Sequence, residues 1–208
     1  MRYLLAVLLA AAPAYILGSV NGAISASKLF YRADIREFGS GNPGLTNFYR
    51  VYGRGGALLV IAVDAMKTIF PVLFGGWLFG RWFNMSLLGR AISGLFTILG
   101  HCFPLYYRFK GGKGILAAGT FIIVFDWRIA LVLWSTFVVV VALTRYVSLA
   151  SIIGASALPP TVFFLNNEAL LVLIPMTLCS VLLIARHHAN IKRLLQGTES
   201  KLSLRRKV

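Results

Sequence analysis

Long apolar runs, most of them long enough to cross a bilayer, constrain the fold of this chain more than any other feature. A transmembrane helix needs about 20 mainly apolar residues. Hydrophobic residues make up 58% of the sequence and the mean hydropathy is +0.79, which is more apolar surface than a soluble domain can bury. The runs are Tyr3–Ser27, Gly56–Phe79, Ser86–Phe103, Ile115–Phe125, Ile129–Thr144, Leu149–Leu165 and Ala169–Ala185.

These runs predict an all-α polytopic membrane protein, because backbone polar groups in lipid must pair within their own helix. The stretch from Ile115 to Thr144 is interrupted only at Asp126–Arg128, so it forms either one long helix or two. With two helices, 16 of the 21 Lys and Arg residues fall on one face, as the positive-inside rule requires. Charge therefore favours seven transmembrane helices, with the N-terminus outside and the C-terminus cytoplasmic.

The length, net charge and cysteines of the chain give further expectations. We expect one domain over residues 1–208, an uncleaved first span, and a free basic tail from about residue 197. The net charge of +15 is attributed to topology and not to nucleic-acid binding, because the cations lie between apolar runs. Cys102 and Cys179 have no metal-ligand spacing. We therefore expect no metal and no cofactor.

The fourth apolar run, Ile115–Phe125, is too short to cross a bilayer as a helix. Its residues cover roughly 20 Å at about 1.5 Å each, against a hydrocarbon core of about 30 Å. Non-helical backbone at that depth is tolerated only where protein or a water-filled cavity satisfies it. We therefore expect Gly111–Gly114 to dip into the membrane boundary. A helix beginning there would present its free N–H groups where a phosphate binds.

The first glycine-rich loop, Gly39–Asn47, concentrates hydrogen-bond donors. Its glycines allow close backbone approach, and Arg50 can hold a phosphate with two parallel bonds. Arg36 is a possible second cation. The alternative is an ordinary connector whose charges only set the topology. The side chains and glycine that we assign to substrate here are Ser40, Gly41, Asn42, Thr46 and Asn47.

The second loop reads Lys110-Gly111-Gly112-Lys113-Gly114. It is not a Walker A sequence, because it lacks the four-residue spacer and the Ser or Thr after the lysine. Alone it would indicate a flexible basic turn as readily as a phosphate site, and the short run behind it favours phosphate. His101 lies where a helix meets the interface, where packing and substrate contact are equally consistent with its position.

Two further pairs stand three residues apart on predicted helices. Ser148 and Ser151 share a helical face at the start of a span, where one serine is explained by capping. Asp64 and Lys67 lie inside the second apolar run, where ionisable residues face a bundle interior or cavity. That pair is either a structural ion pair or part of a site.

The tail after the last run carries His187, Asn190, a Leu194-Leu195 pair and Glu199 among cations. Leucines beside cations suit an interfacial amphipathic helix, and a solvated basic tail is the alternative. On a helix, His188 points about 100° away from His187, so we expect it to be more exposed.

These blocks together resemble the bacterial acyl-phosphate-dependent glycerol-3-phosphate acyltransferases, the PlsY family. The resemblance covers nearly the whole chain and rests on Gly39–Arg50, Gly100–Gly114 and the tail pattern from His187 to Glu199. It implies a multi-pass enzyme of the bacterial inner membrane with its active site on or near the cytoplasmic face. Such an enzyme transfers an acyl group from acyl phosphate to the 1-hydroxyl of glycerol 3-phosphate, giving lysophosphatidate and phosphate.

By this resemblance Ser40, Arg50, His187 and Asn190 are the catalytic residues. The implied substrate-binding residues are Gly41, Asn42, Thr46, Asn47, Lys67, His101, Lys110, Gly111, Gly112, Lys113, Gly114, Ser148 and Glu199. Either His187 or the substrate phosphate serves as general base. The implied partners are the two substrates and membrane lipid, with no nucleic acid and no obligate protein partner. The main alternative is a transporter or exchanger of phosphorylated metabolites, which would predict more deep charges and an internal symmetry; a non-catalytic scaffold would not need the donor clusters.

Overall fold

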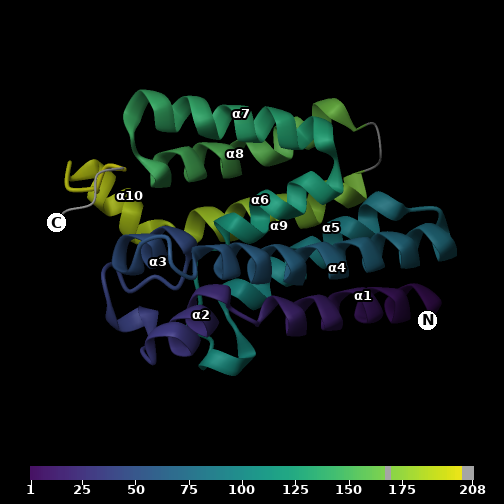
Figure 1. The fold of residues 1–208 in the computed structure, drawn as a ribbon. Coiled ribbons are helices and arrows are strands. Elements are labelled where there is room, and N and C mark those ends of the chain that lie inside the picture. Colours follow the sequence, from purple (N-terminus) through teal and green to yellow (C-terminus); the bar gives the residue numbers. More distant parts are fainter. Residues whose placement is uncertain (167–169, 203–208) are drawn as a thin grey trace. The chain divides into compact units, whose positions relative to one another are not determined.

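The computed structural model describes residues 1–166 and 170–202, and these form helices and loops with no β-strand among them. The helices gather into two compact units, with the boundary between Phe125 and Asp126. Figure 1 colours the first unit from purple to teal and the second from green to yellow.

The first unit is organised around α4, Ala57–Phe83, which packs against five other helices of the unit. Its 27 residues are about 40 Å long, enough to span a bilayer with tilt. Helices α4 and α5 lie side by side in Figure 1. The other elements of this unit are α1 (Arg2–Gly18), α2 (Gly22–Tyr31), η1 (Ile35–Glu37), α3 (Leu45–Tyr52), α5 (Ser86–Cys102), η2 (Leu105–Tyr107) and α6 (Ile115–Phe125).

The sequence predicted one membrane span for the first apolar run, and the structure forms that run from two helices. It is broken between Gly18 and Gly22 into α1 and α2, which together are long and apolar enough to form one span. The break has a local cause, because Asn21 adopts an extended conformation and its side chain caps α2 by accepting from the N–H of Ile24. A polar break at this depth requires partners from neighbouring helices.

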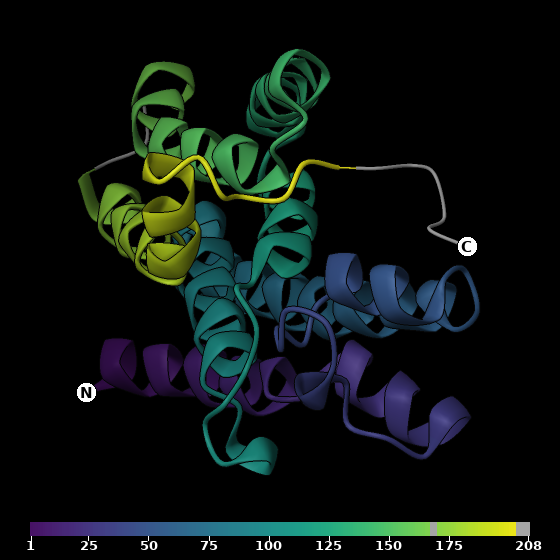
Figure 2. The same cartoon turned by 90° about the vertical axis from the view of Figure 1, so that its left-hand side faces the viewer.

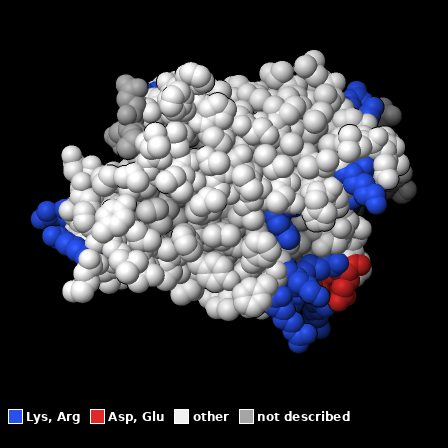
Figure 3. Space-filling view, turned by 180° about the vertical axis from the view of Figure 1, so that it is seen from behind, with Lys and Arg blue, Asp and Glu red and all other residues white. Residues whose placement is uncertain are grey.

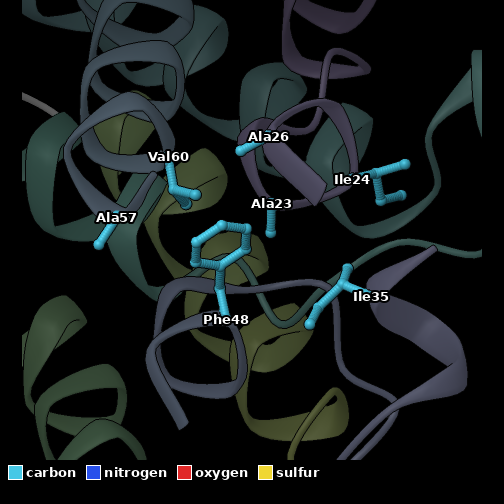
Figure 4. Close-up of a cluster of buried hydrophobic side chains, with 7 residues drawn as sticks. All are labelled: Ala23, Ile24, Ala26, Ile35, Phe48, Ala57 and Val60. Carbon is cyan, nitrogen blue, oxygen red and sulfur yellow. The ribbon is translucent and has the colours of Figure 1, made fainter. Parts of the chain in front are cut away.

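The first glycine-rich loop is also more ordered than expected, because its second half forms α3. Gly44 ends the loop, and Phe48 of α3 is fully buried. Figure 4 shows Phe48 facing a cluster contributed by α2, η1 and α4. This packing anchors α3 beside α2 and α4, and so fixes both ends of the loop. The cluster consists of Ala23, Ile24, Ala26, Ile35, Phe48, Ala57 and Val60.

The run Ile115–Thr144 forms two helices, as the charge pattern predicted. Helix α6 ends at Phe125, and Asp126 caps the next helix by accepting from the N–H of Arg128 at 2.8 Å. Helix α6 has only 11 residues. Arg90 of α5 compensates, because its guanidinium donates to the carbonyls of Val124 and Phe125 at 2.9 and 3.1 Å. The C-terminal end of this short helix is thus satisfied inside the protein.

The second unit consists of α7 (Trp127–Thr144), α8 (Val147–Leu165), α9 (Leu170–Ala185) and α10 (His188–Leu195). Helix α8 packs against α7, α9 and α10, and α10 turns away from α9 by 54°. Figure 2 shows the chain after α10 returning along α8. Ala169, the predicted start of the last span, lies outside the described residues.

The chain after residue 197 is not free, contrary to our expectation. Glu199 bonds to α8 and α10, and the N–H of Leu202 donates to the carbonyl of Arg145 at 2.7 Å. These bonds hold the tail along the helix ends at least to Leu202. Residues 203–208, which were assigned to the same tail, lie outside the described residues.

Within the described residues, five helical segments are long and apolar enough to cross a membrane, and the bent pair α9–α10 is a sixth candidate. The exposed cations of the first unit lie near the ends of its helices. Arg2 stacks on Trp82 at one end, and Lys28 and Arg32 end α2 at the other. Figure 3 shows basic patches at these two ends, with an uncharged surface between them. An uncharged band flanked by cations is typical of a membrane-embedded protein.

Candidate active site

The first loop is held closed by Asn47. Its Oδ1 accepts from the N–H of Ser40 at 2.9 Å, and its Nδ2 donates to the carbonyl of Phe38 at 3.0 Å. Gly39 and Gly41 have positive φ angles of 59° and 70°, which L side chains rarely adopt. The buried Asn47 amide therefore shapes the loop, while the Ser40 side chain remains exposed.

Thr46 and Arg50 stand four residues apart on α3, on the same face, and both are exposed. Asn42 is half-buried in the loop just before the helix. The loop and the helix that follows it thus keep the hydroxyls of Ser40 and Thr46 and the guanidinium of Arg50 at the surface, with the Asn42 amide half-buried beside them.

Arg36 links the two glycine-rich loops. Its guanidinium binds Asp34, with a closest distance of 2.6 Å, and donates to the carbonyls of Tyr107 and Lys110 at 3.2 and 3.3 Å. Hydrogen bonding to Arg36 lowers the pKa of Asp34, so the carboxylate stays charged at neutral pH. The sequence left Arg36 open as a phosphate-binding cation, and the structure uses it to join the loops.

The second loop is largely buried. Gly111, Gly112 and Gly114 are all covered, Lys113 is half-buried and Lys110 is exposed. The N–H of Gly112 donates to the carbonyl of His101 at 3.2 Å. Helix α6 begins directly after Gly114, as predicted, so its first N–H groups point back toward this loop.

Three ionisable side chains form a buried group, here called the membrane cluster: Asp64 and Lys67 of α4 and His101 of α5. Lys67 Nζ lies 2.8 Å from Asp64 Oδ1, 2.9 Å from His101 Nδ1 and 2.6 Å from the carbonyl oxygen of Val20. The three side chains are at most 5% exposed. The sequence left Asp64 and Lys67 as either a structural ion pair or part of a site, and the ion pair that forms is compatible with both alternatives.

The second unit holds another polar group, the tail cluster, formed by Ser148, Asn190, Arg193 and Glu199. Ser148 and the Asn190 amide both donate to Glu199 Oε1 at 2.7 Å, and Arg193 Nε donates to Oε2 at 2.7 Å. Burial alone would raise the pKa of Glu199, but these three bonds outweigh it and lower the pKa. Oδ1 of the buried Asn190 has no hydrogen-bond partner among the described residues.

His187 stands at the N-cap of α10 and is 2% exposed, whereas His188 is exposed, as predicted. Nδ1 of His187 lies 2.7 Å from the carbonyl oxygen of Leu183. A carbonyl carries no proton, so Nδ1 is the donor. In the neutral ring the lone pair is then on Nε2.

The structure thus gathers the predicted residues into two sets. The first unit contains the two glycine-rich loops, Lys67 and His101, and the second contains Ser148, His187, Asn190 and Glu199. The sequence reading missed Asn21, whose Nδ2 donates to the carbonyl of Pro43 in the first loop at 3.1 Å. The signal that could have identified Asn21 is its position as a polar residue inside an apolar run.

Apolar helices with buried charges and donor-rich loops define a helical membrane protein with polar sites inside its bundles. The sequence profile of the glycerol-3-phosphate acyltransferase family matches residues 8–197. The chain therefore belongs to the glycerol-3-phosphate acyltransferase family, and it is an integral membrane acyltransferase.

Individual relatives agree with this assignment. The chain is 37% identical over 196 residues to a glycerol-3-phosphate acyltransferase of Photobacterium profundum, covering 94% of this chain and 93% of that one. It is 38% identical over 201 residues to that of Cupriavidus metallidurans, covering 97% and 98%.

Solved structures of PlsY, an integral membrane glycerol 3-phosphate acyltransferase, share the fold. Its glycerol 3-phosphate form has a TM-score of 0.84 at 32% identity, covering 95% of this chain and 96% of that one. Its lysophosphatidic acid form has a TM-score of 0.82 at 31% identity, covering 95% of both. The resemblance to the PlsY family is confirmed.

Proposed function

We propose that this enzyme transfers a fatty acyl group from acyl phosphate to the 1-hydroxyl of glycerol 3-phosphate. One observation carries the substrate assignment. Two donor-rich loops are joined by Arg36 and come close together at Pro43 and Gly112, in a chain whose structural relative was solved with glycerol 3-phosphate and with lysophosphatidic acid. Loops that share these supports can bind one small phosphorylated substrate.

The reaction needs no covalent enzyme intermediate, because acyl phosphate is already activated. The glycerol hydroxyl oxygen attacks the acyl carbon, the bond from that carbon to the phosphate oxygen breaks, and inorganic phosphate leaves. The hydroxyl proton passes to a base. Negative charge develops on the carbonyl oxygen, and donors such as Ser40 or Asn42 would stabilise it.

The cations are assigned to the phosphates. Arg50, exposed on α3, offers a planar fork that matches phosphate geometry, and Lys113 offers a compact charge beside the first turn of α6. The N–H groups of that turn add a partial positive charge. Asn47 is assigned a positioning role, because both ends of its amide hold the loop backbone.

His187 is assigned to anchor the substrate, and the substrate phosphate to act as the base. The Leu183 contact places the lone pair of the neutral imidazole on Nε2. That atom can accept from a glycerol hydroxyl. The same atom would be the one to take the proton if His187 were the base.

We infer seven membrane spans in the bacterial inner membrane, with the N-terminus outside and the active site near the cytoplasmic face. The cation bias supports this orientation, and the capped short helix α6 supports the fourth span. Single cysteines at positions 113 and 126, in protein lacking Cys102 and Cys179, test it. Labelling of position 126 from the cytoplasmic side alone would contradict the seven-span topology.

The reaction itself is tested with purified protein, glycerol 3-phosphate and either palmitoyl phosphate or palmitoyl-CoA. We expect lysophosphatidate and phosphate in equal amounts with the acyl phosphate, and no turnover with the thioester. Equal rates with both donors would remove the acyl-phosphate assignment. A transporter would bind glycerol 3-phosphate without forming lysophosphatidate.

Arg50 and Arg54 provide a matched pair for this assay, because both are exposed arginines at or just after α3. Arg50→Gln should lower kcat/KM by roughly 10- to 100-fold, as expected for loss of a charged phosphate contact. Arg54→Gln should behave like the wild type. Equal losses in both variants would remove the specific role of Arg50.

A further inference from the structure

The Asp64–Lys67 pair needs an explanation that the proposed reaction does not supply. A buried ion pair adds little stability, because desolvation offsets the attraction between the charges. Here Asp64 Oδ2 has no hydrogen-bond partner among the described residues, which makes the pair more costly still. Charges buried in a span usually serve function.

Each charge of the pair binds one of the two helix ends at the break in the first span, where α1 ends and α2 begins. Lys67 binds the carbonyl oxygen of Val20 just after the end of α1, and Asp64 Oδ1 accepts from the N–H of Gly22 at the start of α2 at 3.1 Å. A helix end with free carbonyls favours a cation, and a helix start with free N–H groups favours an anion. The pair therefore fixes the geometry of the break.

The break in turn holds the first glycine-rich loop. Asn21 lies between these two contacts, and its amide both caps α2 and donates to the carbonyl of Pro43. Asn21 and Pro43 are buried. A displacement of Asn21 at the break would therefore displace Pro43 and the loop that carries Ser40.

Lys67 also fixes the imidazole of His101. A lysine ammonium has three N–H donors and no acceptor, and its three neighbours here are Asp64, Val20 and His101. Nδ1 of His101 must therefore accept, which puts the ring proton on Nε2. The ring is held in one orientation and one tautomer.

The far side of that ring supports the second loop. A methyl group added at Gly112 would overlap Nε2 of His101 and would lie 3.0 Å from the carbonyl oxygen of Pro43. The N–H of Gly112 is bonded to the His101 carbonyl. Gly112 of the second loop thus lies beside both Pro43 of the first loop and the imidazole that Lys67 orients.

We propose that Asp64 and Lys67 are positioning residues of the glycerol 3-phosphate site, acting through Asn21 and His101. They hold Pro43 and Gly112 at the spacing that the substrate needs. This inference rests on the proposed function. It reassigns Lys67 from a substrate contact to a support, because its three donors already meet protein acceptors.

The decisive variant replaces the pair by apolar residues, Asp64→Leu with Lys67→Met. Replacing both charges leaves no unpaired charge in the bundle, but the Val20 carbonyl, the Gly22 N–H and Nδ1 of His101 lose the polar partners that the pair supplied. We expect a folded protein of lower thermal stability and a KM for glycerol 3-phosphate raised on the order of 10²-fold. The KM for acyl phosphate should change little.

The milder variant Lys67→Gln keeps a donor for His101 and should raise the same KM by a smaller factor. Arg90→Gln is the control, since it removes a half-buried cation of the first unit that donates to α6 carbonyls. It should lower stability without changing the KM for glycerol 3-phosphate. Wild-type KM in a folded apolar-pair variant would overturn the proposal, as would equal rises for both substrates.

A double-mutant cycle separates positioning from direct contact. If Lys67 acts through the imidazole, adding His101→Asn to the apolar pair should weaken substrate binding little further. Losses that multiply would show that Lys67 does not act through the imidazole and would contradict that part of the proposal. Calorimetric titration with glycerol 3-phosphate measures binding without turnover. If the protein bound glycerol 3-phosphate but formed no lysophosphatidate, the proposed reaction would be refuted and the positioning role would still be testable.

Discussion

The membrane cluster and the tail cluster are built from the same chemistry, a carboxylate held by a cation and by neutral groups, but they lie in different surroundings. Lys67 and Asp64 are three residues apart on one helix, with side chains at most 3% exposed. Glu199 is drawn to α8 and α10 from the tail, and its partner Arg193 has a side chain that is 41% exposed.

This difference sets what each cluster can do. Charges excluded from water interact strongly and fix geometry, at the cost of desolvation. A pair whose arginine is partly exposed is screened by solvent and adds little energy, but it can still hold the tail against α8 and α10. We therefore expect the membrane cluster to control the shape of the loops, and the tail cluster to control whether the tail is docked.

The largest expected effect comes from removing one partner of each pair. Lys67→Met leaves Asp64 buried without its cation and should cost about 3–5 kcal/mol of unfolding free energy. Arg193→Met, which breaks the half-exposed pair, should cost at most about 1 kcal/mol. Thermal unfolding of both variants in the same detergent measures this contrast. Similar costs would mean that burial does not separate the two clusters.

A methyl group at Gly112 tests whether the membrane cluster acts on the loop. Gly112→Ala displaces the His101 ring and should raise the KM for glycerol 3-phosphate by roughly 10- to 100-fold. Gly154 of α8 is the control, because an added methyl there meets nothing within 4 Å. Its replacement by Ala should leave kinetics unchanged. Unchanged kinetics in a folded Gly112 variant would remove the loop from the substrate site.

His187 tests whether the second unit carries chemistry. If it anchors substrate, His187→Asn should lower kcat about 10-fold, the value of one hydrogen bond, and leave the acidic limb of the pH–rate profile in place. If it is the base, kcat should fall by about 10²–10⁴ and that limb should vanish. The exposed His188, changed to Asn, is the control.

The smallest effect is the response of the tail to acid. The pKa of Glu199 is lowered in the folded protein, so the bonds of the tail cluster stabilise it above the ordinary glutamate pKa of about 4.3. That stabilisation is lost as the pH falls from there through the lowered value. Hydrogen exchange of residues 198–202 should therefore quicken below about pH 4, relative to helix α4. Glu199→Gln should remove most of this pH dependence, and an unchanged profile would show that another group holds the tail.

Much of this fold was predictable from pattern alone. The apolar runs predicted helices, and the bias of the loop cations toward one face correctly divided α6 from α7, because composition reports which segments must lie in lipid. The break at Asn21 and the helix α3 were missed. Both depend on bonds and packing to residues distant in sequence, such as Asp64 and Val60, which periodicity does not encode.

The sequence by itself determined that this chain is a helical membrane protein with basic, donor-rich loops, because hydropathy, charge bias and donor content are local properties. The tertiary structure alone decided which of these donors are bound to protein atoms. From the sequence, Asn47, Arg36 and Lys67 were each candidates for substrate contact. Burial requires each polar atom to find a partner, and the partners that the fold supplies for these three are protein atoms.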